Sequence, residues 1–209
     1  MSVDSPPATL RVAIPIFPGF EELDAIGPLE VFGLAAQCGL PVSTTLVSSD
    51  PDSVAGGVHG LAITGLEPLS DRFDLVVVPG GAWLSGGKTG VRLAVSDGIL
   101  PRWLADRHAG GAVIASVCTG AFLLQAAGLL AGKVATTHHL AMDDLRQLGV
   151  DVVSNRVIDA GSVLSAGGIA SGLDLALWIL ERTFGQPACG RVEDLMEYRR
   201  QGDVLKVGN

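Results

Sequence analysis

The chain is poor in charged residues, and its basic residues do not gather in any segment. Charged residues make up 17% of the chain, with 14 Lys and Arg against 22 Asp and Glu, and the formal net charge is -8. Nucleic-acid binding requires a basic stripe or patch, and scattered basic residues do not supply one. We therefore expect no direct contact with nucleic acid.

Cysteine is also scarce. The three cysteines, Cys38, Cys118 and Cys189, are odd in number and far apart. They form neither a disulfide framework nor the paired spacing of a zinc site, so we expect neither. Because no basic segment followed by an apolar one stands at the N-terminus, we expect the reducing cytoplasm as the compartment.

Long uncharged runs are rare, and the one at residues 110–132 is long enough to cross a bilayer. Its internal pattern favours another interpretation. Residues 112–117 contain β-branched residues, 118–120 are turn-like, and 121–130 have a helical composition. We therefore predict a buried strand, a turn and a buried helix rather than a membrane span.

Strands and helices alternate along the rest of the chain, where 48% of all residues are hydrophobic. The alternation predicts one α/β domain over residues 10–209, preceded by a flexible tail at 1–9, with a mostly parallel sheet covered by helices on both faces. Gly27-Pro28 is expected to bend or restart the first helix. We predict strands at 10–17, 42–49, 74–79, 112–117 and 134–138, a short strand or hairpin around 61–65, and a hairpin at 155–168. We predict helices at 21–39, 91–107, after Cys118, at 141–149, 172–185 and up to 200.

A Gly-Lys-Thr sequence at residues 87–89 resembles part of a phosphate-binding loop. That loop needs a glycine five residues before its Gly-Lys pair, and the position is Ala82, with Gly81 one residue too early. We therefore interpret residues 86–90 as a flexible loop.

Two glycine-containing turns follow buried strands. The Pro79–Gly81 turn ends one strand at the sheet edge where open α/β sheets bind ligands, although an ordinary turn is the alternative. In Ser116–Gly120, Cys118 stands where the next strand gives way to a helix, as the serine of a nucleophile elbow does. The helix N-terminus is expected to favour the Cys118 thiolate, whereas Cys38 and Cys189 are expected to be inert.

Acidic residues and histidines follow other strands at this edge. Glu21, Glu22 and Asp24 open the helix after the first strand, either as partners of the cysteine or as ordinary helix-start residues. His138 and His139 follow a later strand, and one of them is a candidate base for Cys118, with a structural role as the alternative.

These segments together resemble the ThiJ/PfpI superfamily, of the flavodoxin-like class I glutamine-amidotransferase type, over residues 11–185. Within it, the chain is most similar to isocyanide hydratases and to the N-terminal domains of AraC-type regulators. The resemblance implies a three-layer sandwich with a small β-hairpin, and a homodimer. It implies Cys118 as nucleophile, Asp24 as its acidic partner, and the amides of Gly81 and Thr119 lining an anion pocket. Thr119 stands where the protease-like branch has His, which argues against proteolysis.

Three functions are consistent with this resemblance. The first is a cysteine-dependent hydratase that converts a small isonitrile into an N-substituted formamide without metal or organic cofactor. The second is a non-enzymatic ligand-sensing domain, although the chain ends without the basic DNA-binding module of a complete regulator. The third is a stress-related glyoxalase or redox sensor that depends on Cys118.

Overall fold

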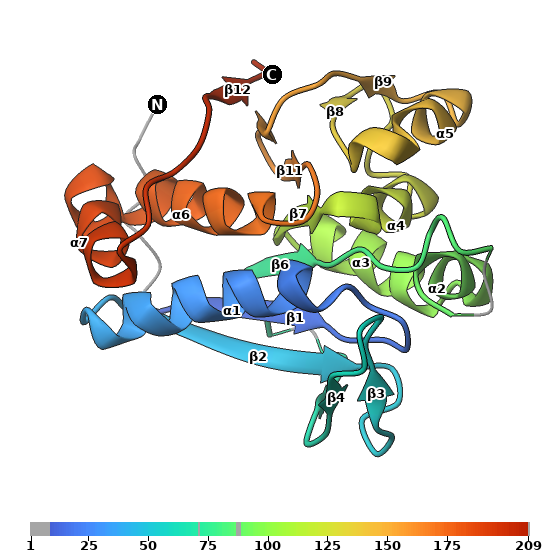
Figure 1. Cartoon of the computed structure of the whole chain (residues 1–209), viewed down its shortest axis with the longest axis horizontal. Helices are drawn as coiled ribbons and strands as arrows, with labels where there is room; N and C mark the ends of the chain where they lie inside the picture. Colours follow the sequence, from blue (N-terminus) through green and yellow to red (C-terminus); the bar gives the residue numbers. More distant parts are fainter. Residues whose placement is uncertain (1–8, 71, 87–88, 209) are drawn as a thin grey trace.

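A central sheet of eight strands organises the computed structural model, which describes residues 9–70, 72–86 and 89–208 (Figure 1). The strand order is β12-β10-β11-β7-β6-β1-β2-β5, and only the β10–β11 pair is antiparallel. The strands are β1 (Leu10–Pro15), β2 (Val42–Ser48), β5 (Glu67–Pro68), β6 (Leu75–Val78), β7 (Val113–Val117), β10 (Val157–Ala160), β11 (Val163–Ala166) and β12 (Val204–Lys206). Strands β1, β6 and β7 are almost wholly buried, as a parallel sheet covered on both faces requires.

Helices cover the two faces of this sheet. One layer holds α1 (Glu22–Gln37), α6 (Ser171–Phe184) and α7 (Gln186–Met196), which pack against one another (Figure 1). The other layer holds α2 (Val91–Asp97), α3 (Ile99–Ala109) and α4 (Ala121–Ala126). The connection from β1 to β2 and the one from β6 to β7 run in opposite directions along the sheet. Right-handed crossovers therefore place α1 and α3 on opposite faces. The expected three-layer α/β sandwich is confirmed.

Small elements complete the structure. Two minor sheets pair β3 (Ala55–Gly56) with β4 (Ala62–Ile63), and β8 (Val134–Ala135) with β9 (Asp151–Val152). Two 3₁₀ turns, η1 (Cys118–Gly120) and η2 (His139–Ala141), precede α4 and α5 (Met142–Gln147). The predicted hairpin at 155–168 is present as β10 and β11, joined at Gly161. None of the described helices is long and apolar enough to span a membrane.

Several predicted boundaries are wrong. The helix expected at 91–107 is two helices, because Gly98 has a φ of +71° and ends one helix as it begins the next. The first helix does not restart at Gly27-Pro28 but continues to Gln37 with Pro28 inside it. The last helix ends at Met196 rather than 200, and the chain then adds β12 to the sheet, which was not predicted. Most of the expected tail and the centre of the loop at 86–90 lie outside the described residues.

The order of the strands determines where a ligand site forms. From β1 the chain moves outward to β2, then returns to β6 on the other side of β1 and continues to β7. This reversal is the topological switch point where open α/β sheets bind ligands at the carboxyl ends of the strands. The segments after β1, β6 and β7 meet there.

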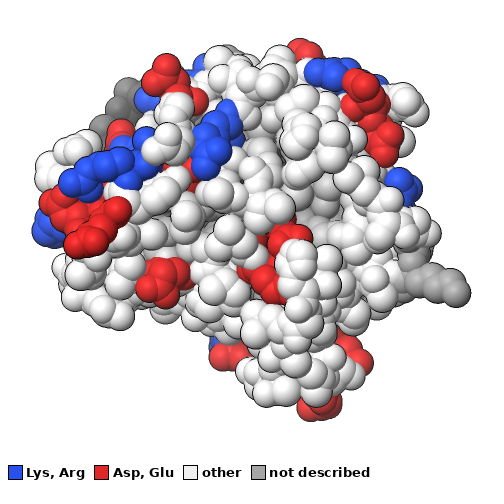
Figure 2. All heavy atoms as spheres, in the orientation of Figure 1, with Lys and Arg blue, Asp and Glu red and all other residues white. Residues whose placement is uncertain are grey.

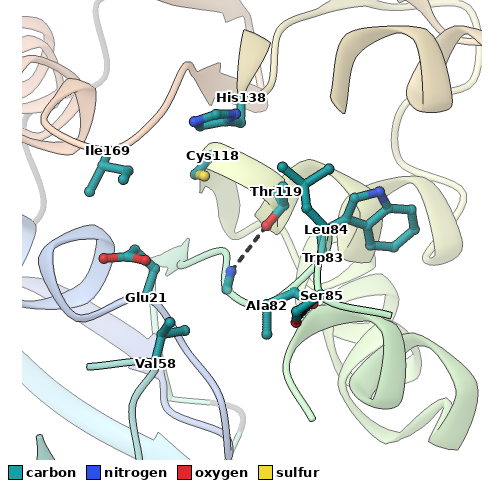
Figure 3. Close-up of a pocket in the computed structure, with 11 residues that line it drawn as sticks. Glu21, Val58, Ala82, Trp83, Leu84, Ser85, Cys118, Thr119, His138 and Ile169 are labelled. Carbon is teal, nitrogen blue, oxygen red and sulfur yellow. Dashed lines mark hydrogen bonds between the residues drawn. The ribbon is translucent and has the colours of Figure 1, made fainter. Parts of the chain in front are cut away.

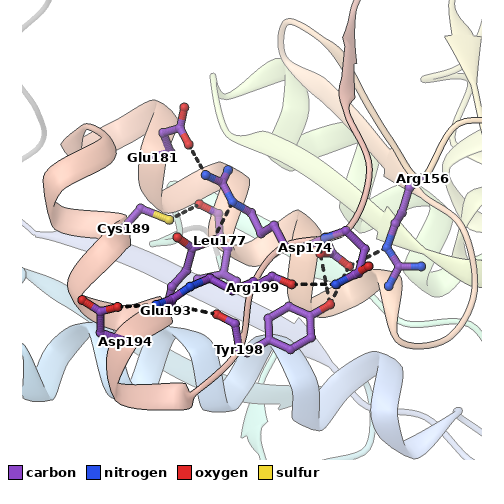
Figure 4. A network of polar contacts seen from close by, with 11 residues as sticks. Arg156, Asp174, Leu177, Glu181, Cys189, Glu193, Asp194, Tyr198 and Arg199 are labelled. Atoms are coloured by element: carbon purple, nitrogen blue, oxygen red, sulfur yellow. Dashed lines mark hydrogen bonds and ion pairs between the residues drawn. The ribbon is translucent and has the colours of Figure 1, made fainter.

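Charged side chains lie mainly away from that point. On the face drawn in Figure 2, many of the Lys and Arg side chains are interspersed with Asp and Glu over the α6–α7 end. Figure 4 shows the pairing at this end, where buried Asp174 accepts hydrogen bonds from Arg156 Nε, Tyr198 Oη and the Gln201 amide. Arg200 pairs with Glu181 and Glu193 nearby. These contacts fix the segment that leads from α7 to β12.

Candidate functional site

Cys118 lies on a strained turn at the carboxyl end of β7. Its φ is +56°, a left-handed conformation that costs a non-glycine residue about 1–2 kcal/mol. Two hydrogen bonds hold it, from the Cys118 amide to the Gly167 carbonyl at 2.9 Å and from Thr137 Oγ1 to the Cys118 carbonyl at 2.8 Å. A Cβ on Gly120 would lie 2.4 Å from the Val78 carbonyl oxygen, so only glycine permits this close approach. Cys118 therefore lies on a tight strand-to-helix turn, and its role as a nucleophile stays a prediction.

Asp24 lies beside this cysteine, fully buried near the start of α1. Its Oδ2 accepts the Gly80 amide at 2.9 Å, and Oδ1 has no hydrogen-bond partner among the described groups. The Asp24 carboxyl and the Cys118 thiol are close enough that each shifts the pKa of the other. The structure therefore brings these two predicted residues together.

The ionisation of this pair differs from the sequence-based expectation. Burial, and then the Asp24 charge, raise the pKa of the Cys118 thiol, whereas the helix N-terminus was expected to lower it. The helix that follows is too short to outweigh desolvation, since a 3₁₀ turn precedes the six residues of α4. Burial also raises the pKa of Asp24 well above its ordinary value. The pair therefore tends to retain a proton, and the expectation of a thiol acidified by the helix is wrong.

The Pro79–Gly81 turn fits tightly between these groups. A Cβ on Gly80 would lie 2.6 Å from the Thr119 amide nitrogen, and one on Gly81 would lie 2.1 Å from the Gly19 carbonyl oxygen. Gly81 also has a φ of +142°. Gly81 and Thr119, whose amides are expected to line an anion pocket, both line the cavity at Cys118, and the Gly81 amide donates to Thr119 Oγ1 at 3.0 Å (Figure 3). In this state the Gly81 amide is already paired.

Thr119 acts on the cysteine directly. Interactions of its amide and its hydroxyl with Cys118 lower the pKa of the thiol, against burial and the Asp24 charge, which raise it. Thr119 Oγ1 also accepts the Gly81 amide, which leaves its own proton available for a further hydrogen bond.

His138 lies over Cys118 in Figure 3, and its contacts describe how its ring is held. Its Nδ1 accepts the Leu140 amide at 3.3 Å, so the neutral ring carries its proton on Nε2. Burial and the neighbouring His139 lower the pKa of His138, which keeps the ring neutral. A Cβ on Gly168 would lie 2.3 Å from His138 Cδ2 and 3.2 Å from Cys118 Sγ. The close packing of these three residues supports the structural alternative for His138.

Of these residues, Gly81, Cys118, Thr119 and His138 line a pocket of about 200 Å³. Sequence reasoning missed six of its lining residues. They are Val58, Ala82, Trp83, Leu84, Ser85 and Ile169, and the only local signal was that four of them, residues 82–85, directly follow the Pro79–Gly81 turn. Glu21 also lines the pocket, and burial raises the pKa of its carboxyl.

One group at the pocket mouth has the composition of a metal site. Ligand atoms of Glu21, Glu22 and His59 lie within 4.8 Å of one another. Glu22 Oε1 already accepts the amides of His59 and Leu61, at 2.6 and 3.4 Å, and His59 Nε2 lies 3.5 Å from Glu21 Oε1. These contacts close the loop between β3 and β4 onto α1, so the group is explained without an ion.

Fold and site together define an α/β protein with a cysteine presented at the switch point of its sheet. The model of the DJ-1/PfpI family matches residues 10–182, and the chain belongs to that family. It is 33% identical over 192 residues to an isonitrile hydratase of Pseudomonas putida. The aligned region covers 90% of this chain and 78% of that protein.

Solved structures agree with this assignment. A ThiJ/PfpI family protein of Pseudomonas syringae superposes with a TM-score of 0.81 at 26% identity, covering 95% of this chain and 79% of that one. An AraC family transcriptional regulator of Pseudomonas putida shares the fold with a TM-score of 0.77 at 23% identity, covering 89% and 98%. The resemblance inferred from the sequence is confirmed at the level of the family.

Proposed function

We propose that this protein is a cysteine-dependent hydratase that adds water to a small isonitrile and releases an N-substituted formamide. The observation that carries the proposal is the buried Cys118–Asp24 pair, with Thr119 in place of a histidine beside the nucleophile. Similarity to an isonitrile hydratase over most of the chain supports it. The small, mainly apolar pocket suits a small organic substrate.

The Cys118–Asp24 pair supplies the nucleophile and the proton for the first step. The isonitrile carbon accepts both a nucleophile and a proton, so sulfur forms a bond to that carbon while the proton held by the pair moves to the same carbon. The raised pKa values of Cys118 and Asp24 keep that proton in the site at neutral pH. In this mechanism the Thr119 hydroxyl and amide stabilise the sulfur as it loses its proton.

The second step hydrolyses the thioimidate formed in the first. Asp24, now a carboxylate, accepts a proton from water as the water oxygen bonds to the carbon. The carbon–sulfur bond then breaks, and the two protons of the water are divided: one passes through Asp24 to the nitrogen and the other to the sulfur, which gives the formamide and the original protonated pair. Every group in this cycle comes from the chain, the isonitrile and water.

The direct test is turnover of a simple alkyl isonitrile by the wild type and by Cys118→Ser. We expect Cys118→Ser to lose activity by a factor of about 10⁴ or more, because the nucleophile itself is removed. Formamide production is measured by chromatography. Cys38→Ser is the matched control, since Cys38 lies half-buried near the end of α1, and it should retain full activity. Activity that survives in Cys118→Ser would contradict the mechanism.

The same experiment separates the alternative functions. A glyoxalase would consume an α-oxoaldehyde and leave isonitriles unchanged, and the Cys118→Ser variant would lose that activity instead. A sensing domain would turn over neither compound in the wild type. The mainly apolar pocket lining and the retained proton support the hydratase over these two.

A further inference from the structure

Three apolar side chains surround the entrance to the Cys118 pocket and remain exposed to solvent. Leu84 is 57% exposed, Val58 44% and Ile169 36%, and all three line the pocket. They come from three separate segments, after β6, between β3 and β4, and before α6. Figure 3 shows them on different sides of the cavity, with Cys118 among them. Covering exposed apolar surface around a pocket is most favourable when the ligand is also apolar, because both surfaces are then removed from water.

Leu84 is held in place by the residue before it. The Trp83 indole stacks on Phe122 with ring centroids 3.6 Å apart, and the Arg92 guanidinium lies 3.9 Å from the indole centroid. Trp83 Nε1 donates to Asp144 Oδ2 at 2.8 Å, and Arg92 Nε donates to the Trp83 carbonyl at 2.7 Å. Both faces and the polar edge of the indole are therefore occupied. We name Trp83, Arg92, Phe122 and Asp144 the indole clamp.

The indole clamp ties the loop after β6 to the helix that follows the nucleophile. Phe122 is buried on α4, which directly follows the η1 turn that carries Cys118, so Trp83 packs against the segment next to the cysteine. Ala82, with a φ of +48°, gives the strained turn that separates Gly81 from Trp83. Trp83 is therefore anchored on both sides, and this places the backbone of the adjacent Leu84 beside the pocket before a ligand binds.

The charges around the pocket favour a neutral ligand. None of the described residues that line it is Lys or Arg, and the carboxyl of Glu21 is part of the wall. An anionic substituent would therefore meet no positive charge and one acidic group.

We propose that Leu84, Val58 and Ile169 form the subsite for the neutral, apolar substituent that the substrate carries, and that the indole clamp positions Leu84 in it. The proposal rests on the proposed function where it names that substituent as the nitrogen substituent of an isonitrile. Leu84 is thus a specificity-determining residue, and Trp83 and Asp144 are positioning residues.

The first test compares kcat/KM for methyl isonitrile and for a long-chain alkyl isonitrile in the wild type and in Leu84→Ala. We expect the preference for the long chain to fall about tenfold or more, since each methylene contact in such a pocket discriminates at least tenfold. The rate with methyl isonitrile should change little. Leu195→Ala is the matched control, because Leu195 is 53% exposed on α7, outside the pocket. An unchanged preference in Leu84→Ala would overturn the proposal.

The second test does not depend on hydratase activity. Cys118 is alkylated with iodoacetamide, with an N-alkyl iodoacetamide or with iodoacetate, and the products are quantified by mass spectrometry. The sulfur–carbon bond forms as iodide leaves and the thiol proton passes to buffer. Wild-type Cys118 should favour the N-alkyl reagent over iodoacetamide and disfavour iodoacetate, relative to half-buried Cys38 in the same molecule. Leu84→Ala should remove the preference for the N-alkyl reagent.

The positioning role is tested with Trp83→Phe and Asp144→Ala. Each removes one partner of the 2.8 Å hydrogen bond, so both should weaken the long-chain preference to a similar extent, and the double variant should add little. Trp103→Phe, which removes the indole hydrogen bond to the Ser70 carbonyl elsewhere, should leave it unchanged. If isonitriles are not hydrated but the alkylation preference shifts as described, the hydratase fails and the subsite stands. If Cys118 is alkylated without favouring the N-alkyl reagent over iodoacetamide, relative to Cys38, the subsite is wrong.

Discussion

At the scale of single residues, two acidic groups of the site, the Cys118 thiol and the Asp24 carboxyl, lie in the same buried environment. Cys118 and Asp24 are both buried, and desolvation is the largest cause of the raised pKa of each. Because a negative charge on one of the two groups raises the free energy of ionising the other, their titrations are coupled. The raised pKa values mean that deprotonating both groups requires a higher pH than either would need in water.

This coupling predicts the effect of Asp24→Asn on the cysteine. The Asp24 charge raises the pKa of the Cys118 thiol, so its removal should lower that pKa and shift the onset of alkylation to lower pH. The measurement is the iodoacetamide labelling rate of Cys118 against pH, followed by mass spectrometry. Hydratase turnover should nevertheless fall, because the variant has no group to deliver the proton. A labelling profile that moves to higher pH would contradict the coupling.

Glycines are the other residues on which the site depends. Gly80, Gly81, Gly120 and Gly168 each stand where a Cβ would collide with backbone or with a site side chain. The turns of the site therefore approach one another more closely than any side chain would allow. This is why the candidate residues lie within contact distance although each comes from a different segment.

At the scale of elements, the site lies where turns from several parts of the chain meet. The turns after β6 and β7 contribute Gly81 and Cys118, the first turn of α1 contributes Asp24, and the turn from β11 into α6 adds Gly168 and Ile169. Each turn follows a strand of the central sheet, and the strands are fixed by their neighbours. The geometry of the nucleophile is thus set by the packing of elements around it.

Gly168→Ala tests this intersection. The added Cβ would lie 2.3 Å from His138 Cδ2, so His138 or the turn before α6 must move. We expect kcat/KM to fall about a hundredfold, since displacements near 1 Å at a reacting centre have effects of that size. Gly33→Ala is the control, because nothing lies within 4 Å of its Cβ position on α1, and it should stabilise the fold slightly. Full activity in Gly168→Ala would show that the turn is free to adjust.

At the scale of the whole molecule, the Asp174 hydrogen-bond network and the pocket at Cys118 lie in different regions. The Asp174 network joins α6, the segment after α7 and the loop before β10, at the end where charged side chains gather in Figure 2. The pocket at Cys118 is lined mainly by apolar groups. The Asp174 network holds α6 to the segment after α7 and to the loop before β10, whereas the turns around Cys118 leave a cavity between them.

Asp174→Ala tests the first of these regions. The Asp174 side chain is 3% exposed and its loss leaves Arg156 without its partner, so we expect the free energy of unfolding to fall by roughly 3 kcal/mol. Urea denaturation measures the change. Asp194→Ala breaks an exposed pair with Arg199 and should cost under about 1 kcal/mol. Equal losses in the two variants would contradict the structural role given to Asp174.

The sequence by itself determined the α/β class, the hairpin at 155–168 and the position of Cys118 at a strand-to-helix turn. Periodicity, glycine and β-branched residues act locally, so their consequences can be read from short segments. The split at Gly98 and the strand β12 were missed, because a helix interruption and an edge pairing depend on what packs nearby.

Only the tertiary structure decided the ionisation of the site and the shape of its pocket. The pKa of Cys118 depends on burial and on a carboxyl from a distant segment, which outweigh the local helix terminus. The pairing of the Gly81 amide with Thr119 and the anchoring of Leu84 through Trp83 likewise join segments far apart in the chain. Desolvation and contact are properties of three-dimensional neighbours, and the order of residues alone does not contain them.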